Sequence, residues 1–178
     1  MFQIKTAIIA VVGSKRSGKT TTVEALVKEL SSRGYRIVTV KHISERNFTM
    51  DTKGKDTWRY AQAGARTIIG IASEEIATIE KASGSVSLRE ILRRCRDHDI
   101  VLLEGFKKLV SKKENISKIV VVKSTEEALQ AVKDFKPILA FTGPYSTERL
   151  NVKPPYVDTL RYPKRIADIV KNSLKKEH

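Results

Sequence analysis

The sequence predicts an α/β protein of three layers, in which a mostly parallel sheet is flanked by helices. Apolar runs and amphipathic segments alternate along the chain, which is the pattern of parallel strands joined by crossover helices. A glycine-rich loop joins the first apolar run to the first amphipathic segment. The chain has 178 residues, 40% of them hydrophobic and 30% charged, and no repeat or low-complexity linker divides it. We therefore expect a single domain over residues 1–178.

The strands are predicted from short apolar runs bounded by polar residues, glycine or proline. In chain order these runs cover residues 4–12, 35–41, 67–72, 76–79, 99–103, 118–122 and 137–141. The runs at 4–12 and 99–103 are the most apolar, and we expect the first to be a buried strand.

The helices are predicted from apolar residues that recur at helical spacing and from signals at the helix ends. The predicted ranges are 20–33, 57–64, 87–96, 126–132 and 164–175. In the first helix, Val23, Leu26 and Leu30 recur at helical spacing. In the third, Ser87 and Glu90 have the spacing of a capping box.

Composition excludes several classes of protein. No apolar run approaches the roughly 18 residues that a membrane span needs, and the first run makes a poor signal peptide. The single cysteine, Cys95, excludes an internal disulfide framework and a multi-cysteine metal site. We expect Cys95 to behave as a small buried hydrophobe. These features predict a cytoplasmic protein without a membrane partner.

Positive charge dominates the chain. Lys and Arg number 34 against 20 Asp and Glu, which gives a formal net charge of +14. A balance of this size is typical of nucleic-acid-binding proteins. The basic residues are scattered, however, and aromatic residues make up only 6%. We therefore favour a solvated surface that attracts anionic small molecules, and we do not expect nucleic acid as a partner.

The strongest signal is a loop that matches G-x-x-x-x-G-K-[ST] in full. Its residues are Gly13, Ser14, Lys15, Arg16, Ser17, Gly18, Lys19 and Thr20, with Thr21 next. Glycines permit close approaches that a Cβ would block, so that loop and helix N–H groups can point at phosphate oxygens. In this pattern the lysine reaches the β- and γ-phosphates and the threonine hydroxyl binds Mg²⁺. With a strand before it and a helix after it, the loop predicts a nucleoside triphosphate site in a P-loop NTPase-like fold.

Two further cations, Lys15 and Arg16, lie inside this loop. Either could contact phosphates, in its own subunit or across a dimer, and the alternative is that both face solvent.

Glu104 ends the apolar run that Asp99 begins. Open α/β sheets bind ligands at the carboxyl ends of their strands, so Glu104 should lie beside the glycine-rich loop. A carboxylate there orders the water shell of Mg²⁺. Because glutamate replaces the commoner aspartate, direct polarisation of a water by Glu104 as the catalytic group is equally open. Asp99 lies at the far end of the strand, and we expect a structural role for it.

The polar stretch over residues 42–56 lacks any periodicity. It contains His42, Asp51, Lys55 and Asp56, which follow a predicted strand at the same edge of the sheet. A loop of this length favours contact with metal or substrate, and the alternative is a solvated loop.

In combination these motifs resemble the MobB family, the molybdopterin-guanine dinucleotide biosynthesis protein B. The matching stretches are Gly18-Lys19-Thr20-Thr21, Val40-Lys41-His42, Asp51, Gly54-Lys55-Asp56-Thr57-Trp58-Arg59, Ala63-Gly64-Ala65 and Leu102-Leu103-Glu104-Gly105-Phe106-Lys107. The Gly-Lys-Asp-Thr-Trp-Arg and Glu-Gly-Phe-Lys stretches are the more specific. Order and spacing agree over residues 5–145, whereas 145–178 predicts a loop and a C-terminal helix.

The resemblance implies a GTP-binding accessory protein of molybdenum-cofactor biosynthesis. It would assist a separate guanylyltransferase, which attaches GMP to molybdopterin to form molybdopterin guanine dinucleotide. It also implies a homodimer, at most slow GTP hydrolysis, and Mg²⁺ near Thr20, Asp51 and Glu104. GTP comes from the resemblance, because the chain has no Asn-Lys-x-Asp motif to read guanine. The roles of Asp56 and Lys107 stay open.

Two other functions are compatible with the residues. A small P-loop kinase acting on a metabolite would need cations over the transferred phosphoryl group, and Arg16, Arg59 and Arg66 could supply them. A clear arginine-bearing lid is missing from the sequence. A nucleic-acid-binding module would show an affinity for oligonucleotides that falls steeply with added salt.

Overall fold

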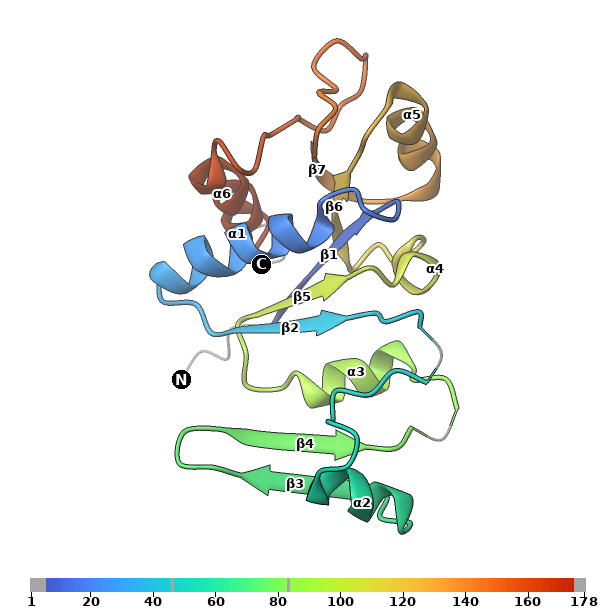
Figure 1. Cartoon of the computed structure of the whole chain (residues 1–178). Helices are drawn as coiled ribbons and strands as arrows, with labels where there is room; N and C mark the ends of the chain where they lie inside the picture. Colours follow the sequence, from blue (N-terminus) through green and yellow to red (C-terminus); the bar gives the residue numbers. More distant parts are fainter. Residues whose placement is uncertain (1–5, 46, 83, 175–178) are drawn as a thin grey trace. The chain divides into compact units, whose positions relative to one another are not determined.

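A computed structural model describes residues 6–45, 47–82 and 84–174, and Figure 1 shows the course of the chain. These residues fall into two compact units. The first unit contains residues 6–42 and 91–174, and the second lies between them, from Ile43 to Glu90. The single domain expected over residues 1–178 stays a prediction.

The first unit is built on a five-stranded parallel sheet. Its strands are β1 (Ala7–Gly13), β2 (Ile37–Lys41), β5 (Ile100–Glu104), β6 (Ser117–Val121) and β7 (Ile138–Thr142). They pair in the order β2-β5-β1-β6-β7, and every pair is parallel. β5 is buried along its whole length, because an inner strand of a parallel sheet is covered on both faces.

Helices lie on both faces of this sheet (Figure 1). α1 (Lys19–Ser32) and α6 (Pro163–Leu174) pack together on one face, and α4 (Lys107–Val110) and α5 (Thr125–Asp134) lie on the other. After α1 the chain moves to one side of β1, and after α4 it moves to the other side. Right-handed crossovers therefore place α1 and α4 on opposite faces.

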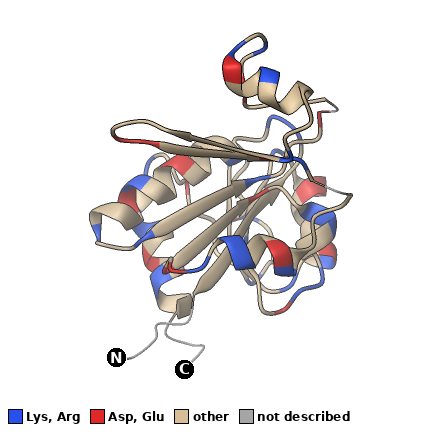
Figure 2. Cartoon of the chain, turned by 90° about the horizontal axis from the view of Figure 1, so that it is seen from below, with Lys and Arg blue, Asp and Glu red and all other residues tan. Residues whose placement is uncertain are grey.

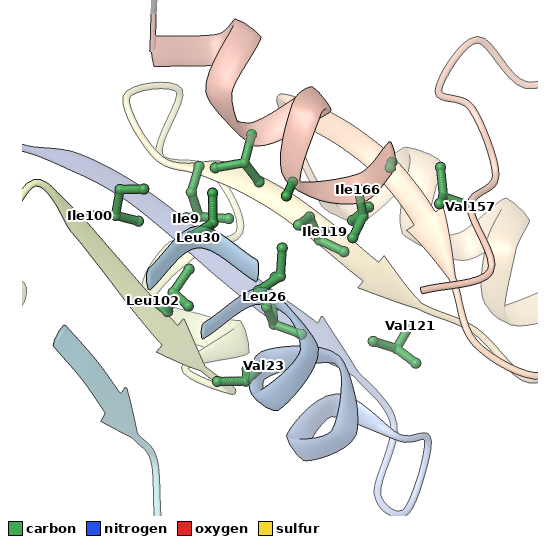
Figure 3. Packing of buried hydrophobic residues seen from close by; sticks show 14 residues of the cluster. Ile9, Val23, Leu26, Leu30, Ile100, Leu102, Ile119, Val121, Val157 and Ile166 are labelled. Atoms are coloured by element: carbon green, nitrogen blue, oxygen red, sulfur yellow. The ribbon is translucent and has the colours of Figure 1, made fainter. Parts of the chain in front are cut away.

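Figure 3 shows the core between α1, α6 and the sheet. Leu26 and Leu30 of α1 and Ile166 of α6 are fully buried in one cluster with Ile9 and Ile119 of the sheet. Each such side chain contributes about 1.5–3 kcal/mol by leaving water. This packing fixes the axis of α1 and so holds its first turn at the edge of the sheet.

The second unit contains a hairpin and a short helix. α2 (Asp56–Gln62) precedes β3 (Thr67–Ile71) and β4 (Ile76–Glu80), which pair antiparallel in a two-stranded sheet of their own. α3 (Leu88–Arg94) begins at the end of this unit and finishes in the first. Ser87 Oγ accepts a 3.2 Å hydrogen bond from the Glu90 N–H, which confirms the predicted cap.

The predicted three-layer α/β fold is confirmed, with element ends shifted by a few residues. Residues 4, 5 and 175, which the predictions included, lie outside the described residues. The strands predicted from residues 35 and 99 begin later, at Ile37 and Ile100. The reason is a bridge ahead of both strands: Arg36 donates its N–H to Asp99 Oδ2 at 2.8 Å and its guanidinium to Oδ1 at 2.9 Å. Asp99 is therefore structural, as expected.

Two further outcomes concern short elements and Cys95. The prediction missed α4, because four residues are too few to show a helical period. Cys95 is buried, as predicted, and burial raises the pKa of its thiol. Along the described residues, no helix is long and apolar enough to cross a membrane.

Candidate nucleotide site

The site is built at the edge where all five parallel strands of the first unit end. The pairing register sets Glu104 beside both Val11 and Lys41, and it sets Gly13 beside Val121. The chain leaves β1 toward β2 on one side and later reaches β6 on the other, so β1 ends at a topological switch point. Ligands of open α/β sheets bind at this kind of position.

The glycine-rich loop is a close-packed turn between β1 and α1. A Cβ on Gly13 would collide with the carbonyl oxygen of Val121 and would lie 2.8 Å from Ser17 Oγ. Gly18 has a φ of +99° and is the N-cap of α1, without a side-chain cap. Only glycine fits the first position sterically, and the second has a backbone conformation that disfavours side chains. The loop therefore keeps the first N–H groups of α1 open toward a ligand.

Two serine hydroxyls of the loop support a polar ligand. Ser14 Oγ and Ser17 Oγ are buried, and neither has a hydrogen-bond partner among the described residues. A buried hydroxyl without a partner is costly, and phosphate oxygens would satisfy both. The loop thus fits the phosphate group that the sequence predicts for it.

Lys19 points back over this loop. Its ammonium donates a 2.6 Å hydrogen bond to the carbonyl oxygen of Ser14. Burial lowers the pKa of Lys19, and the nearby Glu104 carboxylate opposes that shift. A lysine held over a glycine-rich loop at the start of a helix is suited to bind an anion with several oxygens.

The two other cations of the loop lie differently. Lys15 and Arg16 are both exposed, and Arg16 has a positive φ of 57°. Lys123, which follows β6 closely in the chain, donates a 3.3 Å hydrogen bond to the Lys15 carbonyl oxygen. The position of Lys15 and Arg16 at the surface leaves contact with phosphates a prediction. Thr21, the last of the predicted nucleotide-binding residues, is an exposed residue in the first turn of α1.

Thr20 and Glu104, both predicted to lie near Mg²⁺, are in contact. The Thr20 hydroxyl donates a 2.8 Å hydrogen bond to Glu104 Oε1, and the Glu104 side chain is 12% exposed. A hydroxyl and a carboxylate are oxygen ligands of the kind that Mg²⁺ prefers, and Mg²⁺ needs few protein ligands because it retains water. Among the described residues, no group of three or more His, Cys, Asp or Glu is placed to hold a metal. A magnesium site here would thus depend on this pair.

Lys41 completes the cluster, and sequence reasoning did not assign it a role. Its ammonium lies 3.2 Å from Thr20 Oγ1 and 3.2 Å from Glu104 Oε1. Lys41 is the last residue of β2, so its position at the ligand-binding end of a strand was the available signal. Next to this cluster, a groove of about 440 Å³ runs between α1 and β2, from Thr20 and Glu104 to Val27 and Lys28.

His42 and Lys107 lie near Glu104. His42 follows the strand that pairs with β5, and Lys107 comes three residues after Glu104 in the chain. The N–H of His42 donates to the Glu104 carbonyl oxygen at 2.9 Å, and its ring meets Phe106 edge-on with centroids 5.2 Å apart. Lys107 turns away, because its ammonium pairs with Asp134 at 3.5 Å and lies over the Phe135 ring. Both contacts brace the turn that follows Glu104.

Asp51 and Asp56 belong to the second unit. Asp51 Oδ1 accepts hydrogen bonds of 2.8 Å from the Thr52 N–H and from the Thr57 hydroxyl. Its Oδ2 is buried without a partner among the described residues. Asp56 begins α2 and pairs with Arg59 at 3.7 Å. The role predicted for Asp51 beside Mg²⁺ therefore stays a prediction.

The sheet order, the loop and the lysine over it define the class of P-loop nucleotide-binding folds. The sequence model of the family "Molybdopterin guanine dinucleotide synthesis protein B" (MobB) matches residues 8–143. The molybdopterin-guanine dinucleotide biosynthesis adapter protein of Haemophilus influenzae is 32% identical over 175 residues, which are 96% of this chain and 91% of that protein. The chain belongs to the MobB family.

Two further comparisons agree with this assignment. A probable molybdopterin-guanine dinucleotide biosynthesis adapter protein of Bacillus subtilis is 32% identical over 70% of this chain and 71% of its own. A crystal structure described as molybdopterin-guanine biosynthesis protein B superposes with a TM-score of 0.73 at 28% identity, over 94% of this chain and 99% of that one. The family that the sequence motifs resemble is thereby confirmed.

Proposed function

We propose that this protein is a GTP-binding adapter in the biosynthesis of molybdopterin guanine dinucleotide. The observation that carries the proposal is the phosphate cradle at Gly13–Thr20, with its two unpaired serine hydroxyls, in a chain of the MobB family. The names of the relatives from Haemophilus influenzae and Bacillus subtilis, both adapter proteins of this biosynthesis, support the role.

The cradle would bind the triphosphate by charge and by backbone donors. Lys19 exchanges its hydrogen bond to Ser14 for phosphate oxygens, which bind an ammonium more strongly than a neutral carbonyl does. The hydroxyls of Ser14 and Ser17 gain acceptors, and the open N-terminus of α1 adds its dipole. Lys15 and Arg16 within this cradle, and Thr21 next to it, complete the proposed nucleotide-binding set.

Thr20 and Glu104 would hold Mg²⁺, whose positive charge would offset the negative charge of the phosphates. Asp51 is the third proposed neighbour, from the family motif. Glu104 is bonded to Thr20, the last residue of the cradle. It is the proposed catalytic group for a slow hydrolysis of GTP, in which it would orient a water molecule. Slow hydrolysis suits an adapter, because an adapter acts through whether it holds GTP and does not need a high rate of hydrolysis.

An adapter requires a partner. We propose that the partner is a guanylyltransferase that attaches GMP to molybdopterin, and that the protein acts as a homodimer in the cytoplasm. The family relationship does not favour the alternative of a metabolite kinase. Figure 2 shows Lys and Arg scattered over separate helices and loops, so charge alone gives little support to nucleic-acid binding.

Calorimetric titration with GTP and with ATP, each with Mg²⁺, tests the proposal. We expect a clear preference for GTP with little turnover, followed by retention of the guanylyltransferase on the GTP-loaded protein. A preference for ATP would contradict the guanine assignment, and transfer of its phosphoryl group to an added metabolite would support the kinase. Tight binding of an oligonucleotide that weakens steeply with salt would favour a nucleic-acid-binding module.

A further inference from the structure

Three polar atoms converge at the end of the cradle. Lys41 Nζ lies 3.2 Å from Thr20 Oγ1 and 3.2 Å from Glu104 Oε1, and these two oxygens are joined by a 2.8 Å hydrogen bond. Lys41 is brought there by the sheet itself, because it pairs directly with Glu104 in the register of β2 and β5. The side chain is half exposed, at 52%, whereas that of Glu104 is largely buried.

The hydrogen bonds of the cluster run in one direction, from Lys41 to Thr20 and from Thr20 to Glu104. The Thr20 hydroxyl uses its hydrogen to bond Glu104, so its oxygen faces Lys41 with lone pairs alone. The ammonium of Lys41 donates to that oxygen and balances the charge of the Glu104 carboxylate. A carboxylate that is buried and unpaired is costly, so a cation at this position stabilises the cluster.

The same two oxygens are the ligands that fit Mg²⁺. Two cations that share one hydroxyl oxygen and one carboxylate oxygen would repel each other strongly at such short range. We propose that Lys41 is the resident counter-cation of this site and competes with Mg²⁺ for Thr20 and Glu104. The inference rests on the proposed function for the identity of the metal nucleotide, and on the geometry of the three side chains for the competition.

The competition has two consequences. With no metal bound, Lys41 keeps Glu104 paired and keeps the Thr20 hydroxyl directed at it, so the ligand pair does not have to be assembled when metal arrives. Metal binding must break the ion pair, which lowers the apparent affinity for Mg²⁺. Because the Lys41 side chain is half exposed and flexible, it can leave without a shift of β2.

The test compares Lys41→Met with wild type and with Lys28→Met. Lys28 lies on the exposed side of α1 in the adjacent groove, so its variant loses the same charge at a position without a described contact to Glu104. Binding of a fluorescent GTP analogue is followed while Mg²⁺ is increased. We expect the half-saturating Mg²⁺ concentration to fall about two- to fivefold in Lys41→Met, which is the range for breaking a partly exposed ion pair. Lys28→Met should match wild type.

An unchanged or higher Mg²⁺ requirement in Lys41→Met would overturn the inference, as would the same decrease in Lys28→Met. Lys41→Gln serves as a second variant, with the same expected direction, in case the methionine variant folds poorly. Failure of wild type to bind any guanine nucleotide would contradict the proposed function instead. The competition is then measured with Mg²⁺ alone, as the rise in Tm, which should be larger in Lys41→Met than in wild type; equal rises would overturn it.

Discussion

The Thr20 hydroxyl and Glu104 Oε1 are joined by a 2.8 Å hydrogen bond although 84 positions separate the two residues in the chain. Thr20 lies in the first turn of α1, and Glu104 ends β5, which pairs with β1. The bond therefore links the helix that follows the glycine-rich loop to the neighbouring strand. It brings together the two oxygens that we propose as ligands of Mg²⁺ beside the glycine-rich loop.

Removal of the Glu104 charge should weaken the dependence on Mg²⁺. Glu104→Gln retains an oxygen that can accept from Thr20 but cannot balance a divalent cation. We expect the affinity for Mg²⁺·GTP to fall about tenfold and any hydrolysis to fall with it, while binding of GTP in EDTA stays close to wild type. Nucleotide titrations with and without Mg²⁺ measure both quantities.

Asp99→Asn is the matched control, because Asp99 lies just before the opposite end of the same strand. Its bonds to Arg36 hold the pKa of the Asp99 carboxyl below its usual range, so this variant should lose stability and retain nucleotide binding. An effect of Glu104→Gln on binding that does not depend on Mg²⁺ would contradict the assignment of Glu104 to the metal.

Lys19→Ala should abolish the binding of triphosphate. Charge-assisted hydrogen bonds contribute about 1.5–3 kcal/mol each, so loss of the ammonium should weaken GTP binding by about a hundredfold or more. The fold should persist, because Lys19 projects over the loop and bonds only the Ser14 carbonyl among the hydrogen bonds described for its side chain. Calorimetry measures the affinity, and circular dichroism measures the fold.

Lys28→Ala, on the same helix, is the control for loss of a positive charge and should bind GTP as wild type does. If Lys19→Ala retained the affinity of wild type, the glycine-rich loop would not be a triphosphate site.

Gly13→Ala should damage both stability and binding. The added Cβ would collide with the Val121 carbonyl oxygen and crowd Ser17 Oγ, and both are fixed by the sheet and the loop. Overpacking of this kind costs about 1–3 kcal/mol, so we expect a lower Tm and weaker GTP binding. Thermal unfolding with and without GTP gives both effects.

Gly70→Ala is the matched control. Gly70 lies in β3, where a Cβ would meet open space. This variant should unfold at the wild-type temperature or slightly above it, since alanine loses less conformational entropy than glycine. A Tm of Gly13→Ala equal to that of wild type would contradict the close packing of the loop.

Lys118 should make stability depend on pH in the alkaline range. It is fully buried at the start of β6, and its ammonium donates hydrogen bonds of 2.5 Å to the carbonyl oxygens of Lys113 and Lys136. Burial lowers the pKa of Lys118 from 10.5 to about 8. Between these two values the unfolded chain binds more protons than the folded one, so the contribution of Lys118 to the free energy of unfolding rises with pH.

The measurement is chemical unfolding of wild type and Lys118→Met from pH 7.5 to 10.5. The difference in free energy of unfolding should move in favour of wild type as pH rises, by about 1.4 kcal/mol for each pKa unit between the two states. Lys113→Met removes an exposed ammonium from the residue whose carbonyl oxygen accepts one of these bonds. It should leave the dependence of the free energy of unfolding on pH unchanged. Parallel pH curves for wild type and Lys118→Met would exclude the lowered pKa.

The sequence alone predicted the parts of the site that are local. Eight contiguous residues form the cradle, and an apolar run before it with an amphipathic run after it indicates the strand and the helix that hold it. Glu104 was predictable as well, because a carboxylate at the end of an apolar strand lies at the edge where such folds bind ligands. These signals depend on short-range sterics and on periodicity, which are determined by residues close together in the chain.

Other features depend on which distant segments pair and pack. The register of β2 and β5 sets Lys41 beside Glu104. The sequence places Lys41 at the end of a strand and in the Val40-Lys41-His42 stretch, but it did not assign Lys41 a role in the site. The sequence also did not predict the separate antiparallel sheet of β3 and β4, the short α4 or the burial of Lys118. Thus the sequence by itself determined the fold class and the glycine-rich loop that we propose as the phosphate cradle. The tertiary structure decided which charges surround that cradle, because strand register and burial result from packing over the whole chain.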